Sequence, residues 1–303
     1  MDASFFKGII PPIATPIDEN ENVNENKLRE HIDFMIDRGV SGILAFGSNS
    51  EFYMMDKAEQ KEVLSIILDQ VNGRVPVYMG VGMIRTKACI DLALMGKEMG
   101  VSAVSVLQPM FLKPTEDELY THFSSIASAL GDTPMLLYNN PGRTGYPISQ
   151  NLVERLAHEK ENLIGMKDSS GDITQTEEFI RRNRDVGFRV MCGKDTVIFP
   201  GLAVGCVGAV CCTANFIPEL VCSIYDKFMA GDLKGALEAQ FRLNPIRIQM
   251  DSSSFPVAMK DLGNILGREL GKPFLPNKPS TEAQVKGLIK VLNENGYKVT
   301  EEK

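Results

Sequence analysis

The sequence predicts an α/β protein, a (β/α)8 barrel followed by a C-terminal helical domain. Short apolar runs rich in β-branched residues alternate with amphipathic helical segments. Eight such strand–helix units suit a closed barrel better than an open sheet. Beyond about residue 230 the strand signal disappears, and only helical patterns remain. We therefore expect a catalytic barrel over residues 1–228 and a helical domain over residues 229–303.

Most of the expected strands are almost continuously apolar rather than alternating. Parallel strands show this pattern when helices cover one face of the sheet and a core fills the other. The eight runs are Gly8–Thr15, Gly42–Gly47, Pro76–Val81, Ala103–Gln108, Met135–Asn139, Leu163–Lys167, Arg189–Gly193 and Gly208–Thr213.

The segments between these strands have helical spacing and local helix-start signals. Apolar stripes recur at Leu28, Ile32, Met35 and Ile36, and at Leu220, Ile224 and Phe228. Thr115 with Glu118 predicts a capping box, and Asp56 with Glu59 resembles one. In the C-terminal region helices are expected over Asp232–Met250, Val257–Leu266 and Thr281–Asn295.

A doubly wound open sheet is the alternative fold, because it needs the same alternation of strands and helices. The first strand, however, runs into Pro16 and the segment Ile17-Asp18-Glu19-Asn20. It has no GxGxxG turn leading into a helix, which a dinucleotide-binding sheet would show. The barrel is the favoured prediction.

Composition excludes several classes of protein. The 303 residues include 32 basic and 39 acidic side chains, a formal charge of −7, so a nucleic-acid partner is not expected. No apolar run approaches the roughly 20 residues of a membrane helix. The N-terminal segment, residues 1–7, does not resemble a secretion signal, so the expected location is the cytoplasm.

The chain has few residues for metal or disulfide chemistry. Its six cysteines form no CxxC pair, and most lie in apolar surroundings, which favours buried thiols. Its three histidines, His31, His122 and His158, all lie in segments with helical patterning. We therefore expect no metal site and no histidine-dependent catalytic triad.

Lys167 is the first candidate for chemistry, because it closes an apolar strand and is followed by Asp168-Ser169-Ser170-Gly171. Barrel active sites lie at the carboxyl ends of the strands. Burial disfavours an ammonium group and favours the neutral amine that forms a Schiff base with a keto acid. The alternatives are a lysine that extends to the rim, or one that pairs with Asp168.

Tyr138 ends the preceding strand and is the second candidate. It lies one βα unit before Lys167, so the two side chains can meet at the barrel mouth, where a phenol can transfer protons. The following loop carries Arg143, a fork-shaped donor suited to a carboxylate. A tyrosine at the edge of the core and a surface arginine are the alternatives.

The third candidate is the turn Gly47-Ser48-Asn49-Ser50-Glu51 after the second strand. Small hydroxyl and amide side chains with exposed backbone N–H groups can hold a carboxylate. No GK[ST] follows, so the turn is not a P-loop. A plain polar turn is the alternative.

Together these segments resemble the dihydrodipicolinate synthase / N-acetylneuraminate lyase family of class I, pyruvate-dependent aldolases. The resemblance covers nearly the whole chain. It is carried by Ile13-Ala14-Thr15-Pro16, the Gly47–Glu51 turn, Tyr138-Asn139-Asn140-Pro141-Gly142-Arg143-Thr144-Gly145, Lys167-Asp168-Ser169-Ser170-Gly171-Asp172 and Cys192-Gly193-Lys194-Asp195.

The resemblance implies a TIM barrel with a C-terminal helical domain, assembled as a homotetramer built from two dimers. It implies that Lys167 forms the Schiff base with pyruvate and that Tyr138 relays protons. It also implies a set of substrate-binding residues: Ser48 and Asn49 for the pyruvate carboxylate, the backbone at Val210 for the pocket wall, and Arg143 for the carboxylate of the aldehyde. No metal or organic cofactor is expected.

Two departures from the family pattern bear on the substrate. Asn49 and Ser50 replace a threonine and a glycine of the usual turn, and Asn49 cannot pass a proton as a hydroxyl can. Met110 and Phe111 stand where the synthase branch has two adjacent tyrosines, one of which reaches across a subunit interface into a proton relay.

The expected activity is a dihydrodipicolinate synthase-like condensation of pyruvate with an aldehyde such as aspartate semialdehyde, which Arg143 favours. The altered turn and the missing tyrosines keep a second reading open, an aldolase that cleaves 2-keto-3-deoxy sugar acids or related 2-keto acids. A keto-acid-binding relative without turnover is a further alternative, although a mere binder has no need of a buried lysine.

Overall fold

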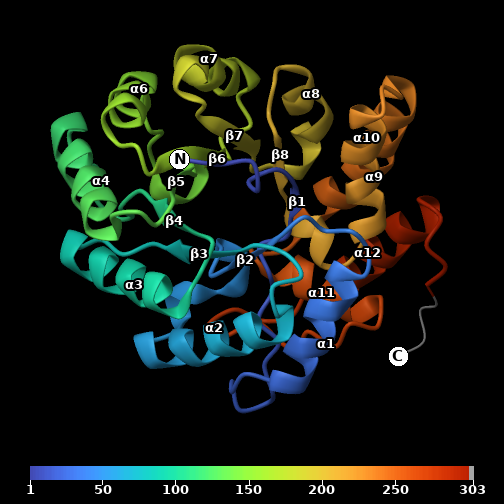
Figure 1. The fold of residues 1–303 in the computed structure, drawn as a ribbon. Helices are drawn as coiled ribbons and strands as arrows, with labels where there is room; N and C mark the ends of the chain where they lie inside the picture. Colours follow the sequence, from blue (N-terminus) through green and yellow to red (C-terminus); the bar gives the residue numbers. More distant parts are fainter. Residues whose placement is uncertain (300–303) are drawn as a thin grey trace.

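A computed structural model describes residues 1–299 and contains a single eight-stranded parallel sheet (Figure 1). The strands pair in the order β1-β8-β7-β6-β5-β4-β3-β2. They are β1 (Gly8–Ile10), β2 (Ile43–Ala45), β3 (Val77–Val81), β4 (Ala103–Leu107), β5 (Met135–Asn139), β6 (Leu163–Asp168), β7 (Arg189–Cys192) and β8 (Gly208–Val210).

The segment after β1 joins β2 and closes the barrel. Leu44 N donates to Pro11 O at 3.0 Å, and Ile13 N donates to Leu44 O at 3.0 Å. Pro12 and Leu44 form the corresponding parallel bridge. The sequence predicted a strand as far as Thr15, but regular pairing in β1 ends at Ile10 because the two prolines have no N–H to donate. The predicted barrel is confirmed.

Helices surround the strands as a ring, and further helices follow the barrel (Figure 1). The ring comprises α1 (Glu25–Ile36), α2 (Lys57–Val71), α3 (Thr86–Met99), α4 (Glu116–Leu130), α6 (Gln150–Glu159), α7 (Ile173–Asn183), α8 (Ile198–Ala203) and α9 (Pro218–Met229), with a short α5 (Pro141–Thr144) after β5. The expected capping boxes at Asp56 and Thr115 are both present.

Single 3-10 turns lie mainly at strand and helix ends. They are η1 (Ser48–Ser50), η2 (Phe52–Met54), η3 (Arg184–Val186), η4 (Asp195–Val197), η5 (Cys212–Asn215) and η6 (Met250–Ser252). The sequence predicted β8 as far as Thr213, but the strand gives way to η5 two residues after Val210.

The C-terminal region consists of α10 (Leu233–Gln249), α11 (Val257–Ile265) and α12 (Glu282–Glu294). These bounds match the three predicted helices within one residue, since Asp232 and Thr281 are the N-caps. α10 packs against α9 and α12, as Figure 1 shows. The division of the chain at residues 228 and 229 falls near the end of α9 and stays a prediction.

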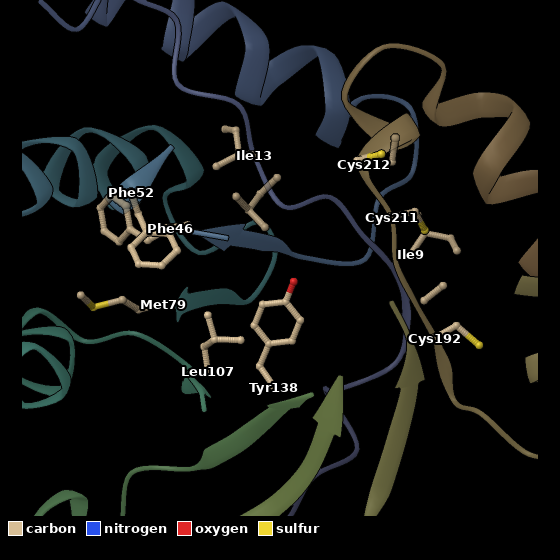
Figure 2. Packing of buried hydrophobic residues seen from close by; sticks show 14 of the residues in the cluster. Ile9, Ile13, Phe46, Phe52, Met79, Leu107, Tyr138, Cys192, Cys211 and Cys212 are labelled. Atoms are coloured by element: carbon tan, nitrogen blue, oxygen red, sulfur yellow. The ribbon is translucent and has the colours of Figure 1, made fainter. Parts of the chain in front are cut away.

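Two apolar cores position the strand ends. One side chain from each strand fills the barrel interior: Ile10, Leu44, Tyr78, Ala103, Leu136, Ile164, Met191 and Val210, with Phe6 beside them. A larger core lies between the sheet and the helices and includes part of the barrel mouth. Figure 2 shows Tyr138 within this core, with its hydroxyl pointing away from the strand ends.

All six cysteines are buried free thiols, as expected. His31, His122 and His158 lie on α1, α4 and α6, and none of them lines the cavity at the barrel mouth. No helix within residues 1–299 is long and apolar enough to cross a membrane.

A buried ion pair joins the C-terminal region to the barrel. Lys260 Nζ on α11 lies 2.8 Å from Glu51 Oε2, and both side chains are completely buried. Lys260 also donates to Lys272 O at 2.8 Å, and Glu51 Oε1 accepts from Phe274 N at 3.0 Å. Burial lowers the pKa of Lys260, and the negative charge of Glu51 opposes this shift.

Replacing Lys260 by methionine should destabilise the protein, because Glu51 would remain buried and charged without its cation. The expected loss is about 3–5 kcal/mol, measured from the shift of the urea unfolding midpoint. Lys290→Met is the matched control, since Lys290 makes only an exposed, 3.8 Å contact with Glu294. Equal midpoints for the two variants would contradict the assignment.

Candidate active site

A cavity of about 340 Å³ opens at the carboxyl ends of the strands. Its walls come from the segments after β2, β5, β6, β7 and β8 and from the C-terminal region. All six residues singled out in the sequence line it: Ser48, Asn49, Tyr138, Arg143, Lys167 and Val210. The fold thus brings together residues that are up to 162 positions apart (210 − 48).

Lys167 and Tyr138 are direct neighbours on adjacent strands. They are register partners in the parallel pairing of β5 and β6. The Lys167 Nζ lies 4.2 Å from the centre of the Tyr138 ring, and the two residues are 4% and 5% exposed. Because both side chains leave the sheet on the same face, the amine and the phenol share one buried site.

Lys167 neither reaches the rim nor pairs with Asp168. Its low exposure excludes the first alternative. Asp168 has other partners: Asn139 Nδ2 donates to it at 2.8 Å, Ser170 Oγ at 2.9 Å and Thr176 Oγ1 at 2.6 Å. The two alternatives raised by the sequence are therefore wrong for this structure. Lys167 forms no ion pair within residues 1–299.

The Tyr138 phenol has polar partners on two sides. Its oxygen lies 3.3 Å from Ser48 Oγ, and Asn140 Nδ2 donates to it at 2.8 Å. Burial raises the pKa of Tyr138, but the charge of Lys167 and the hydrogen bonds outweigh this effect, so the pKa lies below its usual 10.0. A phenol in this state releases its proton more readily, as an acid–base group requires.

The Ser48–Asn49 turn is held in a specific backbone conformation. Ser50 Oγ donates to Gly47 O at 2.7 Å, and Glu51 adopts a left-handed φ of 59°. The Asn49 amide is buried, yet its Oδ1 accepts no hydrogen bond from any residue in the described chain. A buried amide without a protein partner on a cavity wall is suited to a polar ligand.

The C-terminal region contributes residues that the sequence did not identify. The Arg143 guanidinium lies 4.0 Å above the Phe255 ring, and Arg247 Nη1 contacts Asp251 Oδ1 at 2.8 Å. Phe255, Arg247 and Asp251 all line the cavity. The sequence marked residues 252–256 only as a break between helices, and no local pattern indicated that this break lies over the barrel mouth.

Asp195 is a further buried group beside the cavity. Its Oδ2 accepts from Thr213 N at 2.8 Å and from Thr213 Oγ1 at 2.6 Å. These contacts join the segments after β7 and β8 and support the wall formed by Val210. Within residues 1–299 there is no cluster of histidine, cysteine, aspartate and glutamate side chains that could hold a metal ion.

Comparison with known proteins gives a consistent result. Residues 5–294 match the Dihydrodipicolinate synthetase family. A 4-hydroxy-tetrahydrodipicolinate synthase of Methanopyrus kandleri is 33% identical over 91% of this chain and 92% of its own length. The synthase of Trichlorobacter lovleyi is 36% identical over 94% of this chain and 98% of its own length.

Solved structures agree. A crystal structure of dihydrodipicolinate synthase superposes with a TM-score of 0.92 at 32% identity, over 97% of this chain and 100% of that chain. A prophage protein of E. coli K12 from the same family, solved in complex with pyruvate, has a TM-score of 0.92 at 27% identity, over 97% and 99% of the two chains. The match by sequence and by fold extends over almost the whole molecule, and the chain belongs to the dihydrodipicolinate synthase family.

Proposed function

We propose that this protein condenses pyruvate with an aldehyde such as aspartate semialdehyde through a Schiff base on Lys167. The observation that carries the proposal is a buried lysine amine 4.2 Å from a tyrosine ring at the mouth of the barrel. The relatives are 4-hydroxy-tetrahydrodipicolinate synthases, which supports the same reaction.

The covalent steps follow from the amine. Neutral Lys167 Nζ adds to the keto carbon of pyruvate, the carbonyl oxygen leaves as water, and uptake of one proton from Tyr138 or solvent gives a protonated imine. Loss of a proton from the adjacent methyl carbon gives an enamine. The enamine carbon then bonds to the aldehyde carbon, whose oxygen takes up a proton. Water, or an amine of the product, finally displaces Lys167.

Tyr138 is the proton carrier in this proposal. Its phenol faces the Lys167 amine, and Asn140 and Ser48 hold its oxygen in place. Its lowered pKa eases the release of the phenolic proton. Because the imine itself serves as the electron sink, the reaction needs no metal or organic cofactor.

The remaining residues bind substrate. Ser48 and Asn49 present a hydroxyl and an unpaired amide for the pyruvate carboxylate. Val210 lines the wall beside them, and the Arg143 guanidinium is available for the carboxylate of the aldehyde. Cleavage of 2-keto-3-deoxy sugar acids would use the same imine and is the second candidate function. The exposed Phe111, at the place where the synthase branch has a relay tyrosine, favours this second function.

The proposal includes assembly of the chain into a homotetramer in the cytoplasm. Phe111 is 97% exposed and adopts a left-handed φ of 73°, which is unfavourable for a bulky residue unless its position serves a contact. Leu112 beside it is also exposed. One similar solved structure is a monomeric dihydrodipicolinate synthase variant. The six free thiols suit a reducing compartment.

Replacing Lys167 by alanine should abolish covalent capture of pyruvate. The wild-type protein, treated with pyruvate and borohydride, should carry one reduced adduct on the peptide that contains Lys167, as seen by mass spectrometry. Lys194→Ala is the matched control, because Lys194 lines the same cavity and is not the nucleophile. Equal capture in Lys167→Ala and wild type would overturn the proposal.

Replacing Tyr138 by phenylalanine should lower kcat by about 10²–10⁴-fold, because the ring remains but the proton carrier is lost. In the wild type, loss of the phenolic proton should produce a decline in kcat below pH 10.0, since the pKa of Tyr138 is lowered. That alkaline limb should be missing in the variant. A pH profile of kcat for both proteins checks this, and an unchanged limb would assign it to another group.

Replacing Phe111 by aspartate should dissociate the assembly, because a charge would then have to be buried at the contact between copies. Sedimentation velocity of wild type and variant measures the outcome. Met229→Asp is the control, since Met229 is another exposed apolar residue, at the end of α9. A wild-type protein that sediments as a monomer would contradict the proposed assembly.

A further inference from the structure

The cavity at the barrel mouth has more positive than negative charge. Its lining includes four cationic side chains, Arg143, Lys167, Lys194 and Arg247, and two acidic ones, Asp195 and Asp251. This contrasts with the chain as a whole, which has a formal charge of −7. A positive cavity in an acidic protein attracts anionic ligands selectively.

Within residues 1–299 only one of the two acids pairs with one of these four cations. Asp251 contacts Arg247, and Asp195 lies in the segment between β7 and α8, where it accepts hydrogen bonds from Thr213. Arg143 and Lys194 have no carboxylate partner within residues 1–299. Lys167 must lose its charge to react, so these two side chains hold the fixed positive charge available to a ligand.

Lys194 lines the same cavity as Lys167 and lies against the loop that follows β6. It lies between β7 and η4, and its side chain passes over Gly171. A Cβ atom at Gly171 would come within 2.9 Å of Lys194 Cδ and 3.4 Å of its Nζ. Gly171 also has a left-handed φ of 76°, a conformation that favours glycine.

The proposed condensation leaves Lys194 without a role. The pyruvate carboxylate is assigned to Ser48 and Asn49, and a single carboxylate on the aldehyde is satisfied by Arg143. The ammonium group of an amino-acid aldehyde gains nothing from a nearby lysine, whereas a doubly charged anion matches two unpaired cations. No glycine-rich phosphate loop is required, because the two side chains themselves supply the charge.

We propose that Lys194 is a specificity-determining residue that, with Arg143, admits aldehydes carrying a phosphate group. This rests on the proposed function, because the phosphorylated aldehyde takes the place of the second substrate in the same condensation. It adds a substrate class to that reaction and leaves the covalent steps on Lys167 unchanged.

The kinetic test compares glyceraldehyde 3-phosphate with glyceraldehyde, which differ only by the phosphate. With pyruvate as co-substrate, the wild type should show the higher kcat/KM for the phosphorylated aldehyde. In Lys194→Ala the ratio of the two kcat/KM values should fall roughly tenfold or more, as expected for loss of one charge-assisted contact. Lys194→Arg should retain most of the ratio.

Lys234→Ala is the matched control, because Lys234 is an exposed lysine at the start of α10, roughly 20 Å along that helix from Arg247. A binding measurement does not depend on turnover. All three proteins are first treated with pyruvate and borohydride, which blocks Lys167 as the reduced adduct. Glycerol 3-phosphate should then bind to the wild-type adduct and to the Lys234→Ala adduct equally well. It should bind at least tenfold more weakly to the Lys194→Ala adduct.

The possible failures are distinguishable. If pyruvate and borohydride form no adduct with wild-type protein, both the proposed function and this inference are overturned. If the adduct forms but the wild type does not bind glycerol 3-phosphate, or the Lys194→Ala ratio equals the wild-type ratio, only the role of Lys194 is overturned.

Discussion

The register of β5 and β6 is the constraint on which the site depends. Tyr138 and Lys167 are partners in the parallel pairing, and this fixes the amine 4.2 Å from the phenol ring. A shift of one residue in either strand would turn one of the side chains to the opposite face of the sheet. Asp168, the next residue after Lys167, shows the result of that alternation. Its carboxylate accepts hydrogen bonds from Asn139 and Thr176 and does not pair with Lys167.

The C-terminal region completes the mouth of the barrel. Glu51, which forms the buried ion pair with Lys260, is the last residue of the turn that presents Ser48 and Asn49. A buried ion pair gives little net stability compared with apolar packing, and its attraction offsets the cost of burying the charges only when its geometry is good. Its position is thus better explained by the orientation of the turn than by stability. Phe255, from the same region, packs on Arg143 at the other side of the cavity.

The sequence predicted the parts of this site that strand ends determine. Lys167 and Tyr138 end apolar runs, and barrel topology places all such ends at one rim. The contacts of Arg143 with Phe255 and of Glu51 with Lys260 were not predictable, because they join residues more than a hundred positions apart in segments without a periodic pattern. The predicted first strand was also too long, because Pro11 and Pro12 have no backbone N–H to donate. The apolar character of the segment does not reveal this local effect.

Charge and burial divide the cavity into two zones with different chemistry. Beneath Lys167 the barrel interior is apolar, with Ile10, Leu136 and Val210 lining the same small space as its side chain. The reacting amine therefore borders apolar side chains on the inner side of the cavity. Toward the rim, Arg143 and Lys194 are exposed to solvent. In the proposed reaction the anionic end of the aldehyde lies at the rim, and its reacting carbon lies at Lys167, above the apolar zone.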